Sequence, residues 1–310
     1  TPLPFIRNFN LFQILKLKNK IKKINPDILV VCQGNIELCI KGLLAGYLSK
    51  IKTISYIPSA QYFKYINFIF YQFRDVLGDM FFNIADIYIT PNKYQKKLIQ
   101  NRSINKETFI ICNPLQCNIY DEIIFSNKEI INIGIIGRIN LKIKNQLISI
   151  EVAKKLIDKK KNFKFHIIGD GKDLEKFKSL ISINNLSENF IFYGWLEDEE
   201  KNKIIQNHID IIMVPSLIET GLPLVVYDAF ENNKKFLMSD IDSIKEYYLP
   251  EQFLININDI DSLVEKIICL NELTDNYEYI KFRKKIFNEY SLDKFKIQVK
   301  ETFEKILCGH

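Results

Sequence analysis

The sequence is poor in the residues that most often bind metals. It has three histidines and six cysteines in 310 residues, with no two histidines at metal-ligand spacing and no Cys-x-x-Cys pair. A zinc site, or any resident metal or cofactor, is therefore not expected. The cysteine pattern favours reduced thiols over a disulfide framework, which predicts a cytoplasmic protein. No run approaches the ~18 apolar residues that a membrane-spanning helix needs.

A strong charge of one sign is also absent. The 43 Lys and Arg exceed the 37 Asp and Glu by a net charge of +6, which is too small to indicate a nucleic acid partner. The excess is confined to residues 1–125, which hold 16 Lys and Arg and 8 Asp and Glu. A solvated surface explains this excess, and so does an anionic partner such as a membrane surface or a phosphorylated acceptor. The sequence leaves both explanations open.

Short apolar runs alternate with amphipathic stretches along the chain. The runs are nearly continuous, as is typical of strands that are buried on both faces, and the stretches between them have helical periodicity. This alternation predicts βαβ units and the α/β class. We expect nine strands, at residues 27–33, 52–58, 86–91, 108–113, 131–138, 163–170, 189–195, 210–216 and 235–240.

The length predicts about two domains. The apolar pattern breaks near residues 118–128, so we expect one domain over 1–125, a second over 126–290, and a C-terminal helix over 291–310 that packs back toward the first. A doubly wound domain usually opens with a strand and a glycine turn, but this chain opens with a helical stretch. We therefore expect the first domain to lack roughly two or three initial strands.

The second half carries polar and glycine residues after successive strands, where open α/β sheets bind ligands. Gly134 and Gly137 end the first of these strands, and Arg138 and Lys144 follow. Glycine lets a ligand approach the backbone, while an arginine fork and a lysine can hold a diphosphate. The alternative is that Arg138 and Lys144 are exposed surface cations that bind no ligand.

The next two strands end in a similar way. Gly169-Asp170-Gly171 has the composition of a turn, and His166 within the preceding strand is expected to be a core histidine. Gly194 precedes Trp195, the single tryptophan. That ring could stack on a nucleotide base or cap the core.

The fourth feature runs from Glu219 to Asp228. Pro223 is expected in the first turn of a helix, whose free N–H groups and positive dipole end form an anion site. Glu219 lies in the loop before the helix and Asp228 within it. Two carboxylates can accept hydrogen bonds from sugar hydroxyls, although a capped surface helix explains the same pattern.

Order and spacing make these features specific in combination. The succession Gly-Arg, Lys-Asn-Gln, Ile-Gly-Asp-Gly, Phe-x-Gly, Pro-Ser and Glu-Thr-Gly-Leu-Pro-Leu-Val-Val-Tyr-Asp-Ala resembles the C-terminal domain of retaining glycosyltransferases with the GT-B fold, family four, also called glycosyltransferase group 1. The resemblance is strong over residues 130–250. It extends weakly into the first half through Asn25-Pro26-Asp27, Ala85–Ile89 and Asn113-Pro114.

The resemblance implies two facing Rossmann-like domains, with the sugar donor bound by the second and the acceptor by the first. It assigns Arg138 and Lys144 to the donor diphosphate, Glu219 to the sugar hydroxyls and Asp228 to the ribose, and it places the base at the loop from Gly194. The implied catalytic residues are thus Arg138, Lys144 and Glu219. The donor-binding residues are Gly137, Gly194, Trp195, Thr220, Gly221, Leu222, Pro223 and Asp228.

Three departures from the family pattern stand out. Eight residues separate Glu219 from Asp228 where the family usually has seven and a second glutamate. The spacing from Arg138 to Lys144 is one residue longer than usual, so Lys142 is a rival for the diphosphate. Ser59 to Gln61 stand where many relatives carry a histidine.

The resemblance implies a metal-independent retaining glycosyltransferase of bacterial cell-surface polysaccharide synthesis. Its donor would be a UDP-sugar or GDP-sugar, and its acceptor a glycan or a polyprenyl-linked glycan. A sugar-nucleotide epimerase of the same fold is one alternative, although it needs acid–base residues and histidines are few. A catalytically silent nucleotide-sugar-binding protein is another.

Aromatic residues crowd residues 59–83 in the basic half of the chain. A buried helix and loop is one interpretation. The other is an interfacial element that contacts anionic lipid at the inner face of the cell membrane, with Ser59, Gln61, Lys64 and Arg74 on the acceptor or membrane side.

Overall fold

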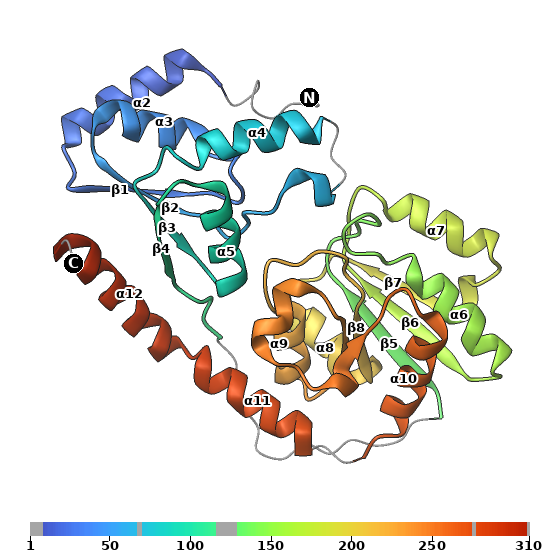
Figure 1. The fold of residues 1–310 in the computed structure, drawn as a ribbon. Helices are drawn as coiled ribbons and strands as arrows, with labels where there is room; N and C mark the ends of the chain where they lie inside the picture. Colours follow the sequence, from blue (N-terminus) through green and yellow to red (C-terminus); the bar gives the residue numbers. More distant parts are fainter. Residues whose placement is uncertain (1–8, 67–69, 116–128, 275–276, 309–310) are drawn as a thin grey trace. The chain divides into compact units, whose positions relative to one another are not determined.

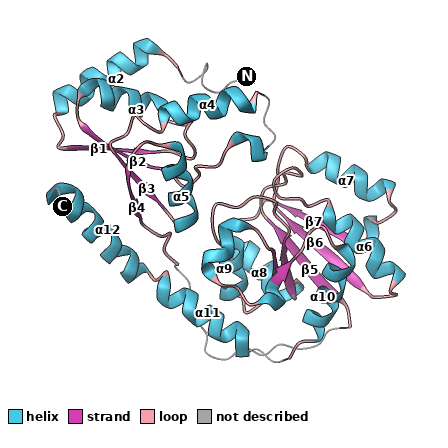
Figure 2. Ribbon diagram, in the orientation of Figure 1, coloured by secondary structure: helices cyan, strands magenta, loops and turns pink. Residues whose placement is uncertain are grey.

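The computed structural model describes residues 9–66, 70–115, 129–274 and 277–308 (Figure 1). The chain forms two compact units. Unit 1 comprises residues 1–114 and 290–310, and unit 2 comprises residues 115–289. Each unit contains a parallel sheet flanked by helices (Figure 2). This architecture confirms the predicted α/β class.

Unit 1 has a four-stranded parallel sheet. Its order is β1 (Ile28–Cys32), β2 (Lys52–Tyr56), β3 (Ile87–Thr90) and β4 (Glu107–Ile110). The helical elements before and between the strands are α2 (Leu11–Ile24), α3 (Ile40–Ser49), η1 (Phe63–Ile66), α4 (Tyr71–Phe81) and α5 (Lys93–Arg102).

The last helix, α12 (Leu292–Cys308), belongs to unit 1. Ile306 packs in one apolar cluster with Ile54 of β2 and Ile87 of β3. The Lys52 Nζ donates to the Ile306 carbonyl at 2.7 Å. The chain thus returns from unit 2 to complete the core of unit 1.

Unit 2 has a six-stranded parallel sheet in the order β10-β9-β8-β5-β6-β7. The strands are β5 (Ile131–Ile136), β6 (Phe163–Ile168), β7 (Phe190–Gly194), β8 (Ile211–Val214), β9 (Lys235–Ser239) and β10 (Leu254–Ile255). The helical elements are α6 (Ile148–Asp158), α7 (Leu174–Ile183), η2 (Ser187–Asn189), α8 (Asp198–His208), α9 (Leu224–Glu231), η3 (Asp242–Tyr247), η4 (Glu251–Phe253), α10 (Ile260–Glu272) and α11 (Tyr277–Glu289).

All nine predicted strands are present, and β10 is an additional strand that the sequence did not predict. β10 has two residues, which is too short to produce a readable apolar run. β3, β8 and β9 are buried at every position, as their continuous apolar runs predicted.

The C-terminal end of α9 is anchored in the core of unit 2. Phe230 packs edge-to-face against Phe236 at a centroid distance of 5.7 Å and against Tyr279 at 5.8 Å. The Tyr279 hydroxyl donates to the Ala229 carbonyl at 3.2 Å, and the buried Arg283 donates to the Phe230 carbonyl at 3.2 Å. These contacts hold rigid the helix that carries Asp228.

Candidate active site

The strand order of unit 2 creates a switch point between β5 and β8. From β5 the chain passes to β6 and β7 on one side, and β8 then continues to β9 and β10 on the other. β5 and β8 pair directly. Ligands of open α/β sheets bind beside the carboxyl ends of the strands at such a point. Here the two ends lead to Arg138 and to the loop that contains Glu219.

The loops at this edge of the sheet are joined by backbone hydrogen bonds. Gly137 N–H donates to the Ile168 carbonyl at 2.9 Å, and Gly169 N–H donates to the Gly194 carbonyl at 2.7 Å. The Leu217 N–H donates to the Ile143 carbonyl at 2.8 Å, which joins the loop after β8 to the loop after β5. The loops after β5, β6, β7 and β8 therefore form one rigid surface.

The glycines at this edge have separate structural reasons. Gly137 has a φ of +129°, and a Cβ built on it meets nothing within 4 Å, so its backbone is open to a ligand. A Cβ on Gly169 would lie 2.1 Å from the Gly137 carbonyl oxygen, so this glycine lets two loops approach. Gly134 is different, because a Cβ there would collide with Ile209 inside the core. Of the predicted glycine pair, only Gly137 faces open space.

The cations after β5 differ in their surroundings. Arg138 is exposed, and within the described residues its guanidinium has no hydrogen-bond or ion-pair partner. The Lys144 Nζ lies 2.5 Å from Glu219 Oε1, and the two side chains are 32% and 11% exposed. Lys142, the rival, is exposed, and within the same ranges no acidic side chain pairs with it. The geometry therefore favours Lys144 as the lysine of the site.

The helix after β8 begins directly after Pro223, which is its N-cap and not a residue of the first turn. α9 starts at Leu224, and Pro223 is its N-cap residue with a φ of −70° and a ψ of 148°. Proline at this position still leaves the first N–H groups of the helix directed outward. Thr220, Gly221 and Pro223 are partly buried and Leu222 is buried, so the loop is fixed against the unit. The start of α9 thus offers free N–H groups, and an anion site there stays a prediction.

Asp228 lies on α9 and pairs with a lysine of the neighbouring helix. The Lys201 Nζ of α8 is 3.0 Å from Asp228 Oδ1 and 3.0 Å from Asp198 Oδ1. Burial raises the pKa of Asp228, and the charge and hydrogen bond of Lys201 oppose this shift. No sequence pattern indicates this pair, because the two residues come from different βα units.

Trp195 and His166 have opposite environments. Trp195 is 70% exposed, so the interpretation of this ring as a cap on the core is wrong. Gly194 before it has a φ of +71°, with open space where a Cβ would stand. His166 is buried as predicted, with Nδ1 2.9 Å from the Tyr193 hydroxyl and Nε2 3.2 Å from Asn132 Oδ1. Burial lowers the pKa of His166 to about 4, so the ring is neutral.

The predicted acceptor-side residues of unit 1 do not share one environment. Arg74 is 4% exposed and forms a two-pronged ion pair with Glu37, with nitrogen–oxygen distances of 2.6 and 2.5 Å. Its guanidinium also stacks 4.2 Å from the centre of the Phe63 ring. The expectation that Arg74 meets lipid or acceptor is therefore wrong, because the side chain is already paired inside the unit.

Lys64, Gln61 and Ser59 lie on the segment after β2. Lys64 is exposed, with Nζ 4.8 Å from the centre of the Tyr65 ring. Gln61 is 8% exposed, and its Nε2 donates to the Tyr94 hydroxyl at 3.3 Å, so its side chain points into the unit. Ser59 is partly buried. Lys64 is thus the predicted residue that is best placed to meet a partner.

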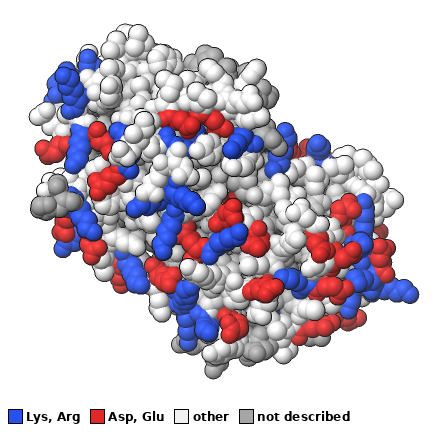
Figure 3. Space-filling model, viewed as in Figure 1, with Lys and Arg blue, Asp and Glu red and all other residues white. Residues whose placement is uncertain are grey.

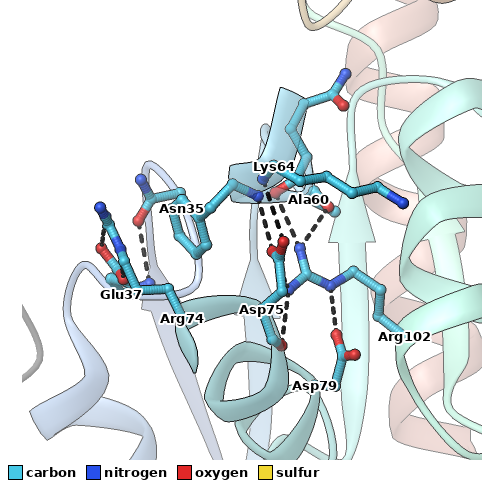
Figure 4. Close-up of polar contacts among 10 residues, drawn as sticks. Asn35, Glu37, Ala60, Lys64, Arg74, Asp75, Asp79 and Arg102 are labelled. Atoms are coloured by element: carbon cyan, nitrogen blue, oxygen red, sulfur yellow. Dashed lines mark hydrogen bonds and ion pairs between the residues drawn. The ribbon is translucent and has the colours of Figure 1, made fainter. Parts of the chain in front are cut away.

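Asp75 and Arg102 hold the segment after β2 in place through hydrogen bonds to its backbone (Figure 4). The Asp75 carboxylate accepts hydrogen bonds from the backbone N–H groups of Phe63 at 2.7 Å and Lys64 at 3.2 Å. The buried Arg102 donates to the Ala60 carbonyl at 3.1 Å and to Asp79 at 2.7 Å. Sequence reasoning missed these residues, because only the fold brings α4, α5 and the segment together.

Two further features bear on ligand binding: a cavity in unit 2 and the distribution of possible metal ligands. Unit 2 has a cavity of about 400 Å³ whose lining includes none of the predicted donor residues. Its lining residues are Asn145, Leu147, Ile148, Ile150, Glu151, Leu180, Asn184 and Ile257. Across the described ranges, no three or more His, Cys, Asp or Glu side chains gather as a potential metal site.

The fold is that of the GT-B glycosyltransferases. The structure of Anabaena HepE in complex with UDP superimposes with a TM-score of 0.74 at 14% identity, and the alignment covers 94% of this chain and 81% of that one. A likeness at this identity establishes the fold.

The sequence also identifies the family. Residues 119–286 match the family described as glycosyl transferases group 1, and the chain belongs to that family. This confirms the resemblance drawn from the motifs.

Two relatives match at the level of sequence. The UDP-Gal:alpha-D-GlcNAc-diphosphoundecaprenol alpha-1,3-galactosyltransferase of Escherichia coli is 28% identical over 173 residues, which are 52% of this chain and 42% of that protein. An uncharacterized glycosyltransferase of Methanocaldococcus jannaschii is 27% identical over 277 residues, which are 80% of this chain and 64% of that protein. The chain thus spans less than two thirds of the length of either relative.

Proposed function

We propose that this protein is a retaining, metal-independent glycosyltransferase. It moves a sugar from a nucleoside diphosphate donor to a glycan or lipid-linked acceptor in cell-surface polysaccharide synthesis. The observation that carries the proposal is the arrangement at the β5–β8 switch point. There an exposed arginine, a lysine–glutamate pair and a helix start lie on adjoining loops.

This arrangement suits the departure of a diphosphate. Negative charge grows on the leaving group as the anomeric bond breaks, and preorganised positive groups stabilise that charge. Arg138 supplies a planar fork, Lys144 a point charge and the start of α9 a dipole end. These groups take the role that a divalent cation has in other transferases. The leaving phosphate takes the acceptor proton, and the new bond forms on the face that the diphosphate leaves.

The names of the relatives support the classes of substrate. The Escherichia coli relative is named for a UDP-galactose donor and a diphosphoundecaprenol acceptor, and the HepE structure holds UDP. We therefore propose a UDP-sugar donor, with a GDP-sugar as the alternative, and a polyprenyl-linked glycan as acceptor.

A transfer assay tests the proposal. The protein is incubated with labelled UDP-sugars or GDP-sugars and a polyprenyl-diphosphate-linked sugar, with and without EDTA. We expect a labelled glycolipid in which the anomeric configuration of the donor is kept, in equal amounts with and without the chelator. Inversion of the configuration, or a requirement for metal, contradicts the corresponding part of the proposal.

Replacement of Glu219 by alanine tests the sugar contact. The carboxylate is held by Lys144 at 2.5 Å, in position to accept hydrogen bonds from sugar hydroxyls that move during bond breaking. We expect kcat to fall and the donor KM to rise, with kcat/KM lower by roughly 10- to 100-fold, as for the loss of a charged hydrogen bond. Steady-state kinetics measure both constants.

The matched control for this variant is Glu199→Ala on the exposed face of α8, where the carboxylate is 83% exposed. The control is expected to behave as the native protein. If Glu219→Ala has the same kcat and KM as this control, Glu219 does not contact the sugar.

We also propose that unit 1 contacts an anionic membrane surface at the cytoplasmic face. Three apolar side chains of α4 lie exposed at helical spacing, with Phe73, Val76 and Met80 at 55%, 62% and 63% exposure. Figure 3 shows an uncharged, white area at the top of unit 1, with Lys and Arg side chains gathered to its upper left, over α2. Such a stripe beside lysines suits the headgroup region of a bilayer. In the described part of the chain, each helix is too short or too polar to cross a bilayer.

Vesicle sedimentation tests this contact. We expect binding to vesicles that contain phosphatidylglycerol, weaker binding at high salt, and at least a roughly fivefold loss for Lys64→Glu with Phe73→Ser. Ile104→Ser is the control, because Ile104 is 75% exposed elsewhere in unit 1. Equal binding to phosphatidylcholine vesicles, or no binding to either, removes the membrane from the proposal.

A further inference from the structure

Lys201 connects two helices that flank the candidate donor site. It lies in the first turns of α8, which follows the Trp195 loop, and it reaches Asp228 on α9. The Lys201 and Asp228 side chains are only 18% and 17% exposed, and their charged atoms are 3.0 Å apart. The pair is therefore largely shielded from water, unlike the other ion pairs of α8.

Only one oxygen of the Asp228 carboxylate is engaged. Lys201 binds Oδ1, and in the described ranges no protein group donates a hydrogen bond to Oδ2. The Asn232 side chain donates to the Asp228 backbone carbonyl at 2.9 Å, not to the carboxylate. A carboxylate oxygen retains lone pairs for a ligand hydroxyl when its neighbour is bound to a lysine.

The electrostatic surroundings of Asp228 make its ionisation depend on Lys201. Burial raises the pKa of Asp228, Lys201 lowers that pKa, and Asp198 raises it. Among the residues that the structure describes, Lys201 is the cation that acts on this carboxyl and Asp198 the anion. Burial lowers the pKa of Lys201, but the hydrogen bonds and charges of Asp198 and Asp228 together outweigh it and raise that pKa, so the ammonium stays charged at neutral pH.

We propose that Lys201 is a positioning residue for the donor nucleotide, which holds the Asp228 carboxylate ionised and oriented toward the ribose hydroxyls. The inference rests on the proposed function, because it needs a nucleotide donor with Asp228 at its ribose. It adds a residue of α8 to the site. It also explains how an aspartate, one methylene shorter than glutamate, is kept in a defined position.

Titration calorimetry of Lys201→Met with UDP tests the proposal. At pH 6 we expect roughly tenfold weaker binding than for the native protein, because loss of the lysine charge raises the pKa of the carboxyl, and a protonated carboxyl accepts hydrogen bonds poorly. The loss should shrink toward pH 8.5. The sign follows from the lysine: without its charge the pKa of Asp228 rises, so the carboxyl ionises only at higher pH.

A second ligand separates this role from a general structural one. The compound 2′,3′-dideoxy-UDP lacks both ribose hydroxyls. The native protein should prefer UDP to this analogue, and Lys201→Met should lose most of that preference at pH 6. Lys201→Arg keeps the positive charge and should retain the preference.

The control is Lys203→Met on the same helix. Lys203 pairs with Glu199 at 2.7 Å in a surface ion pair, and its side chain is 64% exposed. Equal affinities of Lys201→Met and Lys203→Met at every pH overturn the proposal, and so does an equal loss for UDP and its dideoxy analogue. If the native protein binds neither UDP nor GDP, the proposed function itself fails. That outcome differs from the two results that would overturn only the role of Lys201.

Discussion

Arg138→Ala is expected to lower the rate of sugar transfer by about 10²–10³ while the protein stays folded. The guanidinium is exposed beside the open backbone of Gly137, at the carboxyl end of the central strand β5. A positive group placed there before the reaction stabilises charge that develops only in the transition state, so its loss should appear mainly in kcat. Initial rates at saturating donor measure the effect.

The fold should tolerate this substitution for a specific reason. The local contact of Arg138 is made by its backbone, whose carbonyl accepts a hydrogen bond from Gln146 Nε2 at 2.9 Å. Alanine keeps that carbonyl, and an exposed side chain without a protein partner contributes little to stability. The melting temperature of Arg138→Ala should therefore match that of the native protein.

Two further variants make the Arg138 result specific. Lys142→Ala removes an exposed cation from the same loop, and its rate should be nearly native. Arg138→Lys keeps the charge but loses the planar fork, so its rate should fall between the two. Transfer by Arg138→Ala within a few-fold of native would falsify the diphosphate assignment, and a large loss for Lys142→Ala would move that assignment to Lys142.

The strand pattern was readable because it depends on local sequence. A strand covered on both faces needs a continuous apolar run, and each of the nine predicted runs is a strand. β10 was missed because two residues, Leu254 and Ile255, cannot form a run. The start of α9 was also readable, and only the role of Pro223 differs, because proline is compatible with the N-cap as well as with the first turn.

Contacts between distant residues were not readable. Motif spacing indicated Lys144 and Glu219 separately, but their direct pairing spans 75 positions and depends on β5 lying next to β8. Gly134 and Gly137 look equivalent in sequence, yet only the fold shows that Ile209 occupies the space beside Gly134.

Arg74 was misjudged for a similar reason. The aromatic residues around it suggested an exposed interfacial helix, while its partner Glu37 lies 37 positions earlier. Whether this segment contacts a membrane stays a prediction, but Arg74 is one of the buried residues of α4.

Breaking the Glu37–Arg74 pair is expected to be the most destabilising single change considered for unit 1. The two side chains are 1% and 5% exposed and are joined by two hydrogen bonds. Glu37→Ala leaves the Arg74 guanidinium buried without its carboxylate. Removal of one partner from a buried pair costs about 3–5 kcal/mol, since the remaining charge is not compensated.

Hydrogen exchange is the suitable measurement, because it reports on the two units separately. In Glu37→Ala, peptides from β1 to β4 should lose protection, while those from β5 to β9 should keep it. UDP affinity should be unchanged, because the proposed donor residues all lie in unit 2. Glu304→Ala is the control, as it removes an exposed pair of α12 whose Lys300 and Glu304 side chains are 76% and 60% exposed.

A double variant separates charge burial from packing. Glu37→Met with Arg74→Met removes both charges and keeps apolar volume, and such replacements are often neutral or stabilising. We therefore expect the double variant to recover most of the protection that Glu37→Ala loses. Equal protection in Glu37→Ala and Glu304→Ala would show that the pair adds no stability. Loss of protection in the double variant as large as in Glu37→Ala would instead indicate that the two hydrogen bonds themselves hold the loop after β1 against α4.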